Sequence, residues 1–255
     1  LRATVLAAIS FSLCASGVYL MNDLLDLEAD RQHPRKRKRP CAAGRMPLSV
    51  AMALTPLLFV AAFAIATMTN LGLVLVLSIY LFLTSLYSLR LKAIALVDII
   101  LLAVLYTMRM IAGGVAADIH LSQWLLALSM FLFLSLACVK RFSELLVLQQ
   151  RNESRTWGRG YAVGDLEQIA QFGSASAYIA VLVLALYVSS KEIVELYAKP
   201  EVVYLCCPLL LYWVSRIWLL ARRGLVHDDP LVFALRDKVT YVVAAITFVM
   251  FFAAK

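Results

Sequence analysis

The chain has 255 residues, of which 63% are hydrophobic and only 16% are charged. Soluble domains are close to half apolar and about a quarter charged. The composition therefore excludes an ordinary soluble globular protein and predicts an integral, polytopic membrane protein. The formal net charge of +8 does not indicate a nucleic acid partner, because in a membrane protein it more often reflects basic cytoplasmic loops and anionic headgroups or substrates.

Apolar runs of about 20 residues, each long enough to cross a bilayer, recur along the whole chain. They predict an all-α transmembrane bundle, formed as a single domain over residues 1–255, with eight spans at 3–22, 47–67, 71–89, 94–115, 121–139, 170–190, 201–221 and 238–254. Apolar residues begin almost at Leu1. We therefore expect the chain to be an N-terminally truncated piece of a longer protein.

Lysine and arginine are divided unequally between the loops. If the 23–46 loop is cytoplasmic and the spans alternate, 18 of these residues fall on that side and 4 on the other. Such a positive-inside bias places the three long loops, 23–46, 140–169 and 222–237, on the cytoplasmic face of a bacterial inner membrane. We expect the active site on this face, where a lipid substrate could enter from the bilayer.

The greatest concentration of charge follows the first span. Asp23, Asp26 and Asp30 precede six basic residues within 31–39. If the helix continues, the three carboxylates project from one face, with Asn22 beside them. They repel one another and oppose the helix dipole unless a cation lies between them. Oxygen ligands in such a row suit Mg2+, which takes one or two carboxylates plus substrate phosphates, and the basic run supplies phosphate donors.

Two sequences in this region resemble a known family. NDLLDLEAD fits the pattern NDxxDxxxD, and RQHPRKRKRPCAAG is similar to HPxKxxRPxAxG, both typical of the UbiA-type intramembrane prenyltransferase superfamily. The resemblance implies a nine-helix fold whose first helix is missing here. It also implies catalytic roles for Asn22, Asp23 and Asp26. The expected metal ligands, which hold Mg2+ on a diphosphate, are Asn22, Asp23, Asp26 and Asp30, and the expected phosphate contacts are Lys36 and Arg39.

The later cytoplasmic loop departs from the usual superfamily pattern. Members usually carry a second acidic motif, DxxxD, but residues 140–170 contain none. The stretches KRFSEL and RTWGRGY instead resemble the decaprenyl-phosphate phosphoribosyltransferase branch, as does YSLRLK at 87–92. The resemblance implies transfer of phosphoribose from phosphoribosyl diphosphate (PRPP) to a polyprenyl phosphate.

A donor with two phosphorylated groups and a phosphate acceptor together need one metal clamp and several cations. We therefore expect further substrate-binding residues in the spans and the later cytoplasmic loops. The expected cations are Lys92, Arg109, Lys140, Arg141, Arg155 and Arg159, and the other expected substrate-binding residues are Tyr87, Glu144 and Tyr161.

Some of these residues also have structural interpretations. Glu144 lies four residues after Lys140 and could pair with it, rather than bind a ribose hydroxyl or a metal. Arg109 lies within a span, where arginine is usually functional, but it could pair with Asp98. The sequence His227-Asp228-Asp229-Pro230 resembles a metal-ligand set and equally suits the start of a helix.

The sequence therefore predicts a Mg2+-dependent membrane transferase that moves 5-phosphoribose from PRPP to a decaprenyl-type polyprenyl phosphate. One alternative is a prenyltransferase that moves a prenyl group from polyprenyl diphosphate to an aromatic acceptor, although the missing second acidic motif argues against it. Another alternative is a transporter or lipid-binding protein. Such a protein would have its site near the midplane, whereas charge here gathers at one face.

Overall fold

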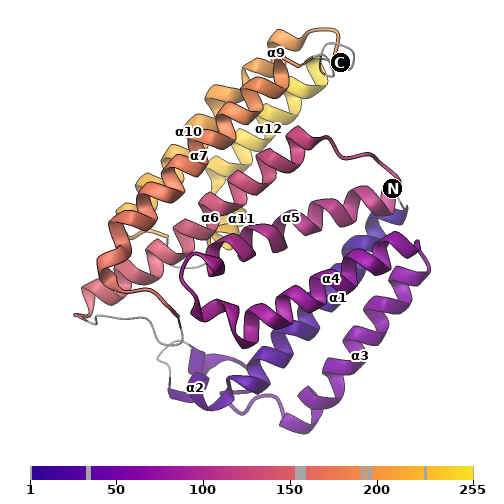
Figure 1. The fold of residues 1–255 in the computed structure, drawn as a ribbon, viewed down its shortest axis with the longest axis vertical. Helices are drawn as coiled ribbons and strands as arrows, with labels where there is room; N and C mark the ends of the chain where they lie inside the picture. Colours follow the sequence, from indigo (N-terminus) through magenta and orange to yellow (C-terminus); the bar gives the residue numbers. More distant parts are fainter. Residues whose placement is uncertain are drawn as a thin grey trace. The chain divides into compact units, whose positions relative to one another are not determined.

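A computed structural model describes residues 2–32, 36–152, 159–190, 193, 197–226 and 229–254. Within these ranges every regular element is a helix (Figure 1), which confirms the predicted all-α class. The chain divides into two compact units. The first comprises Leu1–Leu91 and Met108–Leu121, and the second comprises Lys92–Thr107 and Ser122–Lys255.

The first unit is formed by helices near the N-terminus together with the end of α5. They are α1 (Arg2–Leu25), α2 (Leu27–Gln32), η1 (Lys36–Lys38), α3 (Leu48–Thr67), α4 (Leu71–Leu89) and the part of α5 (Val97–Ala117) from Met108 onward. In Figure 1 the purple helices α1, α3 and α4 lie together, and all three contact one another. The close approach of α1 and α3 depends on Gly17, because a Cβ there would lie 2.8 Å from the Phe59 ring.

The second unit contains the remaining helices. They are the start of α5, α6 (Gln123–Gln150), η3 (Val163–Asp165), α7 (Leu166–Val188), α9 (Pro200–Tyr204), α10 (Cys206–Arg222), α11 (Pro230–Arg236) and α12 (Lys238–Ala254), with η2 (Leu91–Ala93) at the boundary. Helices α6, α7 and α10 enclose its core. There the indole N–H of Trp218 donates to Ser135 over 3.0 Å, and its ring meets Phe142 edge-on.

Seven helices among the described residues are long and apolar enough to cross a membrane, and the number rises to eight if α11 and α12 form one span bent by 78°. Their apolar surfaces and lengths identify an integral membrane protein. The eight spans expected from the sequence correspond to the larger of these two numbers.

Two elements differ from the sequence prediction in ways that affect the site. Helix α6 continues to Gln150 instead of ending at residue 139, because Phe142 and Leu145 extend its buried apolar face beyond the expected membrane boundary. The residues predicted to begin a cytoplasmic loop are therefore helical. The span predicted at 201–221 corresponds to the candidate span Glu201–Arg222, within which a turn at Leu205 separates α9 from α10.

Candidate functional site

The acidic residues of the first unit lie on an almost continuous helix. Helix α1 ends at Leu25 and α2 begins at Leu27. The amide of Asp26 nevertheless donates to the carbonyl of Asn22 over 2.9 Å, and the amide of Asp30 donates to that of Asp26 over 2.8 Å. These bonds preserve the four-residue helical spacing across the break. The helix therefore continues from Asn22 to Asp30, which is the condition under which Asp23, Asp26 and Asp30 are expected to share a face.

Arg39 brings two of these carboxylates to one point. Its Nη1 donates to Asp23 Oδ1 over 3.0 Å and to Asp30 Oδ2 over 2.7 Å. Asp30 is buried, whereas 38% of the Arg39 side chain is exposed. We call Asp23, Asp30 and Arg39 the arginine-bridged cluster. Burial, together with the Asp23 carboxylate, raises the pKa of the nearby Cys41 thiol.

The carboxylates of the arginine-bridged cluster are ligands of the type that a divalent cation requires. No set of three or more Asp, Glu, His or Cys side chains in the described parts of the chain gathers around one possible metal position. Two carboxylates do converge on one positive nitrogen, however, which shows that they can share a cation. Mg2+ usually needs one or two protein carboxylates and completes its coordination with water and substrate phosphates. Asp23 and Asp30 therefore have the donor chemistry of such an ion's ligands, and the inclusion of Asn22 and Asp26 among the ligands stays a prediction.

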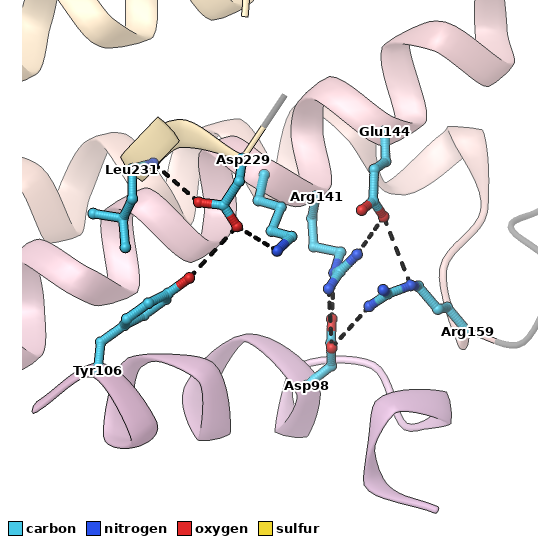
Figure 2. Close-up of polar contacts among 8 residues, drawn as sticks. Asp98, Tyr106, Arg141, Glu144, Arg159, Asp229 and Leu231 are labelled. Carbon is cyan, nitrogen blue, oxygen red and sulfur yellow. Dashed lines mark hydrogen bonds and ion pairs between the residues drawn. The ribbon is translucent and has the colours of Figure 1, made fainter. Parts of the chain in front are cut away.

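The second unit contains a buried network of four ionic side chains (Figure 2). Arg141 and Asp98 have fully buried side chains, and Arg141 binds Asp98 through both Nε and Nη2. Arg141 Nη1 also binds Glu144, and Arg159 Nη1 donates to Asp98 over 3.1 Å. We call these four residues the buried network. Its two guanidinium groups neutralise its two carboxylates, as burial of charge requires.

The segment that carries Arg159 packs closely against the start of α5. A Cβ at Gly160 would lie 2.6 Å from the carbonyl oxygen of Ala93, so only glycine permits this approach. The backbone N–H of Leu96 donates to the Tyr161 hydroxyl over 2.9 Å. Leu96 itself has a φ of 67°, which is a strained value for a residue with a side chain. Burial raises the pKa of Tyr161 to about 12, and its hydroxyl accordingly remains protonated at neutral pH.

Lys140 takes a different partner from its helical neighbour Arg141. Its Nζ lies 2.5 Å from Asp229 Oδ2, and the Tyr106 hydroxyl lies 3.5 Å from the same oxygen (Figure 2). The other oxygen of Asp229 accepts the backbone N–H of Leu231 over 3.0 Å and caps α11. The capping interpretation of Asp229 is therefore confirmed, while His227 and Asp228 lie outside the described residues.

The remaining predicted site residues are distributed over both units. Arg109 is exposed on α5, and its Nη2 lies 3.4 Å from the Tyr80 hydroxyl. Tyr87 lies on α4 and Lys92 in η2, and both are partly buried. Lys36 begins η1, but its side chain is not among those described, and Arg155 lies outside the described residues.

The structure gives Glu144 and Lys140 partners other than the pairing that their sequence spacing suggested. Asp98 is bound by Arg141 and Arg159, and Glu144 is bound by Arg141 rather than by Lys140. The partner of Lys140, Asp229, is 89 residues away. The i,i+3 spacing of Arg141 and Glu144 was a visible signal. The long-range pairs left no comparable pattern in the sequence.

The chain is similar in sequence to known proteins and similar in fold to solved structures. It is 36% identical over 244 residues to the uncharacterized protein y4nM of Sinorhizobium fredii, covering 95% of this chain and 47% of that protein. It is 45% identical over 139 residues to a decaprenyl-phosphate phosphoribosyltransferase of Mycolicibacterium smegmatis, covering 54% of this chain and 44% of that enzyme. The chain thus spans less than half the length of either relative.

The fold resembles that of a UbiA homolog from Archaeoglobus fulgidus solved with GPP and Mg2+ bound. The TM-score is 0.74 at 16% sequence identity, and the match covers 98% of this chain and 88% of that structure. At this identity the likeness concerns the fold alone. Residues 1–235 also match the sequence pattern that defines the UbiA prenyltransferase family. The chain therefore belongs to the UbiA prenyltransferase family.

Proposed function

We propose that this chain carries the activity of a phosphoribosyltransferase, which moves 5-phosphoribose from PRPP to a polyprenyl phosphate of the decaprenyl type and depends on Mg2+. The 45% identity to the M. smegmatis enzyme over 139 residues supports this substrate pair. The proposal also includes a bacterial inner membrane location with the reactive groups on the cytoplasmic side, which the distribution of Lys and Arg between the loops supports.

The observation that carries the proposal is that three carboxylates of the second unit are bound by basic side chains. Asp98 and Glu144 are both bound by arginine, and Asp229 is bound by Lys140. Asp98 is fully buried with an arginine on each of its oxygens, which distinguishes it from the partly exposed Asp23 and makes it a poor candidate for a second metal clamp on a prenyl diphosphate. A PRPP reaction needs cations for its additional phosphates instead, and the partly exposed Lys140 and Arg159 are basic side chains of the second unit that suit this role.

In this proposal Asn22, Asp23, Asp26 and Asp30 would hold Mg2+ against the diphosphate of PRPP. The ion, when bound, neutralises the charge that develops on the departing diphosphate. The surrounding residues bind and orient the substrates. Arg39, released from Asp23 and Asp30, is placed to donate to phosphate oxygens in the bidentate manner typical of arginine.

The transfer itself exchanges one bond for another at the ribose. The bond between C1 and the diphosphate oxygen breaks with oxocarbenium character, and a new bond forms between C1 and an oxygen of the lipid phosphate. The diphosphate leaves with the electron pair of the broken bond. Direct displacement inverts the configuration at C1. The lipid phosphate is already anionic at neutral pH, so positioning and electrostatic stabilisation account for most of the catalysis.

One assay separates this proposal from prenyl transfer. Membranes from cells expressing the protein are incubated with Mg2+ and either PRPP plus decaprenyl phosphate or decaprenyl diphosphate plus 4-hydroxybenzoate. Mass spectrometry then identifies the lipid product. We expect a phosphoribosylated lipid in the first mixture, and a product in the second mixture alone would overturn the proposal. Membranes carrying Asp26→Asn serve as the inactive control in both mixtures.

A further inference from the structure

Lys140 and Tyr106 direct two hydrogen-bond donors toward one oxygen of Asp229. The ammonium comes from α6 and the phenolic hydroxyl from α5, and they approach Asp229 Oδ2 at 2.5 Å and 3.5 Å (Figure 2). An ammonium and a hydroxyl converging on one anionic oxygen form the kind of arrangement that binds phosphate oxygens. In this structure the chain's own carboxylate occupies that place.

The contact between Lys140 and Asp229 is more exposed than the pair of Arg141 and Asp98 in the buried network beside it. The side chains of Lys140 and Asp229 are 28% and 25% exposed, whereas those of Arg141 and Asp98 are fully buried. A partly exposed ion pair contributes little net stability and exchanges partners readily, while a buried pair does not. A soluble anion can therefore recruit Lys140 more easily than it can recruit Arg141.

Asp229 is carried by a short element that is attached separately at its two ends. At the N-terminal end of α11, Asp229 accepts the amide of Leu231 and binds Lys140. At the C-terminal end, Asp237 receives two hydrogen bonds from Arg216, of 2.7 Å and 3.0 Å. Because Arg216 holds the far end, the Asp229 side chain can leave Lys140 without releasing the whole helix.

We infer that Lys140 and Tyr106 form a subsite for a phosphate monoester, and that Asp229 occupies it as an internal anion until that group displaces it. The inference rests on the proposed function, in which two substrates carry such a group. The shared chemistry is a terminal phosphate, either the 5-phosphate of the sugar donor or the phosphate of the lipid acceptor. Tyr106 and Asp229 thereby acquire roles in substrate binding.

The test measures binding without turnover. Purified full-length protein in detergent is titrated calorimetrically in EDTA, so that no metal reaches the aspartates of the first unit. The probes are ribose 5-phosphate and farnesyl phosphate, one for each source of the phosphate. Asp229→Asn is the central variant, because asparagine still caps a helix as well as aspartate does but no longer competes as an anion.

We expect Asp229→Asn to bind at least one probe roughly tenfold more tightly than the unchanged protein, since a competing charge beside an ion pair has been removed. The gain should disappear in the double variant Asp229→Asn/Lys140→Met. Asp237→Asn makes the same chemical change at the other end of α11, where the partner is Arg216, and should give no gain. A gain with ribose 5-phosphate assigns the subsite to the donor, and a gain with farnesyl phosphate assigns it to the acceptor.

Unchanged or weaker binding of both probes by folded Asp229→Asn would overturn the inference, as would a gain that persists without Lys140. Circular dichroism of each variant verifies that the helices remain intact. The binding test and the turnover assay fail independently. Tighter probe binding without a phosphoribosylated product rejects the proposed reaction, and full turnover without tighter binding rejects the subsite.

Discussion

Each unit of this protein contains an arginine shared between two carboxylates, and the two arginines differ chiefly in their access to solvent. In the first unit, Arg39 binds Asp23 and Asp30, and 38% of its side chain is exposed. In the second, Arg141 binds Asp98 and Glu144 with no exposed side-chain surface at all. The same ionic groups can therefore serve as an exchangeable contact in one place and as a fixed structural contact in the other.

The difference follows from the cost of leaving a charge without a partner. When Arg39 moves, water or a metal ion can reach the Asp23 carboxylate, so the contact can open at a small cost. When Arg141 is lost, Asp98 keeps a charge in a place from which water is excluded, and the penalty is several times larger. The comparison predicts that changes in the buried network affect stability, whereas changes in the acidic residues of the first unit affect activity.

The largest effect on stability is expected from Arg141→Met. Loss of one partner from a buried pair destabilises by about 3–5 kcal/mol, and the remaining contact from Arg159 only partly compensates Asp98. Thermal unfolding in detergent, followed by circular dichroism, measures the loss. Arg39→Met, the matched change in the first unit, should lower stability by less than Arg141→Met does, because Arg39 and Asp23 are partly exposed and only Asp30 is a buried partner.

A different result with Arg141→Met would contradict this comparison of the two arginines. If Arg141→Met unfolds at the same temperature as the unchanged protein but no longer binds PRPP, Arg141 is a substrate ligand, as its place in the sequence pattern predicted, and the ion pair with Asp98 is incidental.

The largest effect on activity is expected from Asp26→Asn. Asp26 is partly buried and belongs to the proposed metal ligands, so its loss should lower turnover by at least about 10–100-fold. The melting temperature should change little. Glu28→Gln removes the same charge from an exposed position on α2 and should leave turnover unchanged. Equal losses of activity in both variants would indicate a general electrostatic effect instead of metal binding.

Arg39→Gln tests how Arg39 affects the stabilisation of the protein by Mg2+. Without Arg39, Asp23 and Asp30 repel each other in EDTA, and Mg2+ no longer has to displace a guanidinium. We therefore expect the stabilisation produced by Mg2+ to increase by about 1–2 kcal/mol relative to the unchanged protein, in line with tighter binding to the folded state. Melting temperatures with EDTA and with saturating Mg2+ provide the measurement. A smaller response to Mg2+ in the variant would show that Arg39 assists metal binding.

The sequence contained enough information for the helical fold. Hydrophobic runs of bilayer length predicted the helices, and the i, i+3, i+7 spacing of Asp23, Asp26 and Asp30 predicted a shared acidic face, because both depend on local periodicity. The end of α6 was misplaced because Lys140 and Arg141 resemble a membrane boundary. In the structure, the buried faces of Phe142 and Leu145 carry the helix past it.

The ion pairs were not predictable to the same extent. A carboxylate such as Asp98 signals that a cation must accompany it when buried, but the sequence does not specify which one. Arg141 and Arg159 are brought to Asp98 by tertiary packing, over 43 and 61 residues of sequence. The pairing of Lys140 with Asp229 likewise depends on where α11 lies against α6, which no local pattern encodes.

The smallest effect expected is that of Tyr161→Phe, which tests how the buried network is held in place. The change removes the oxygen that accepts the Leu96 amide and should destabilise by about 1 kcal/mol, measured by thermal unfolding. Leu96→Gly should recover a similar amount, since glycine adopts the positive φ at that position without strain. If Tyr161→Phe instead reduces turnover by more than tenfold while the melting temperature falls only slightly, the hydroxyl contacts substrate. The buried network would then extend into the proposed site, and the contrast between the two arginines would no longer separate stability from activity.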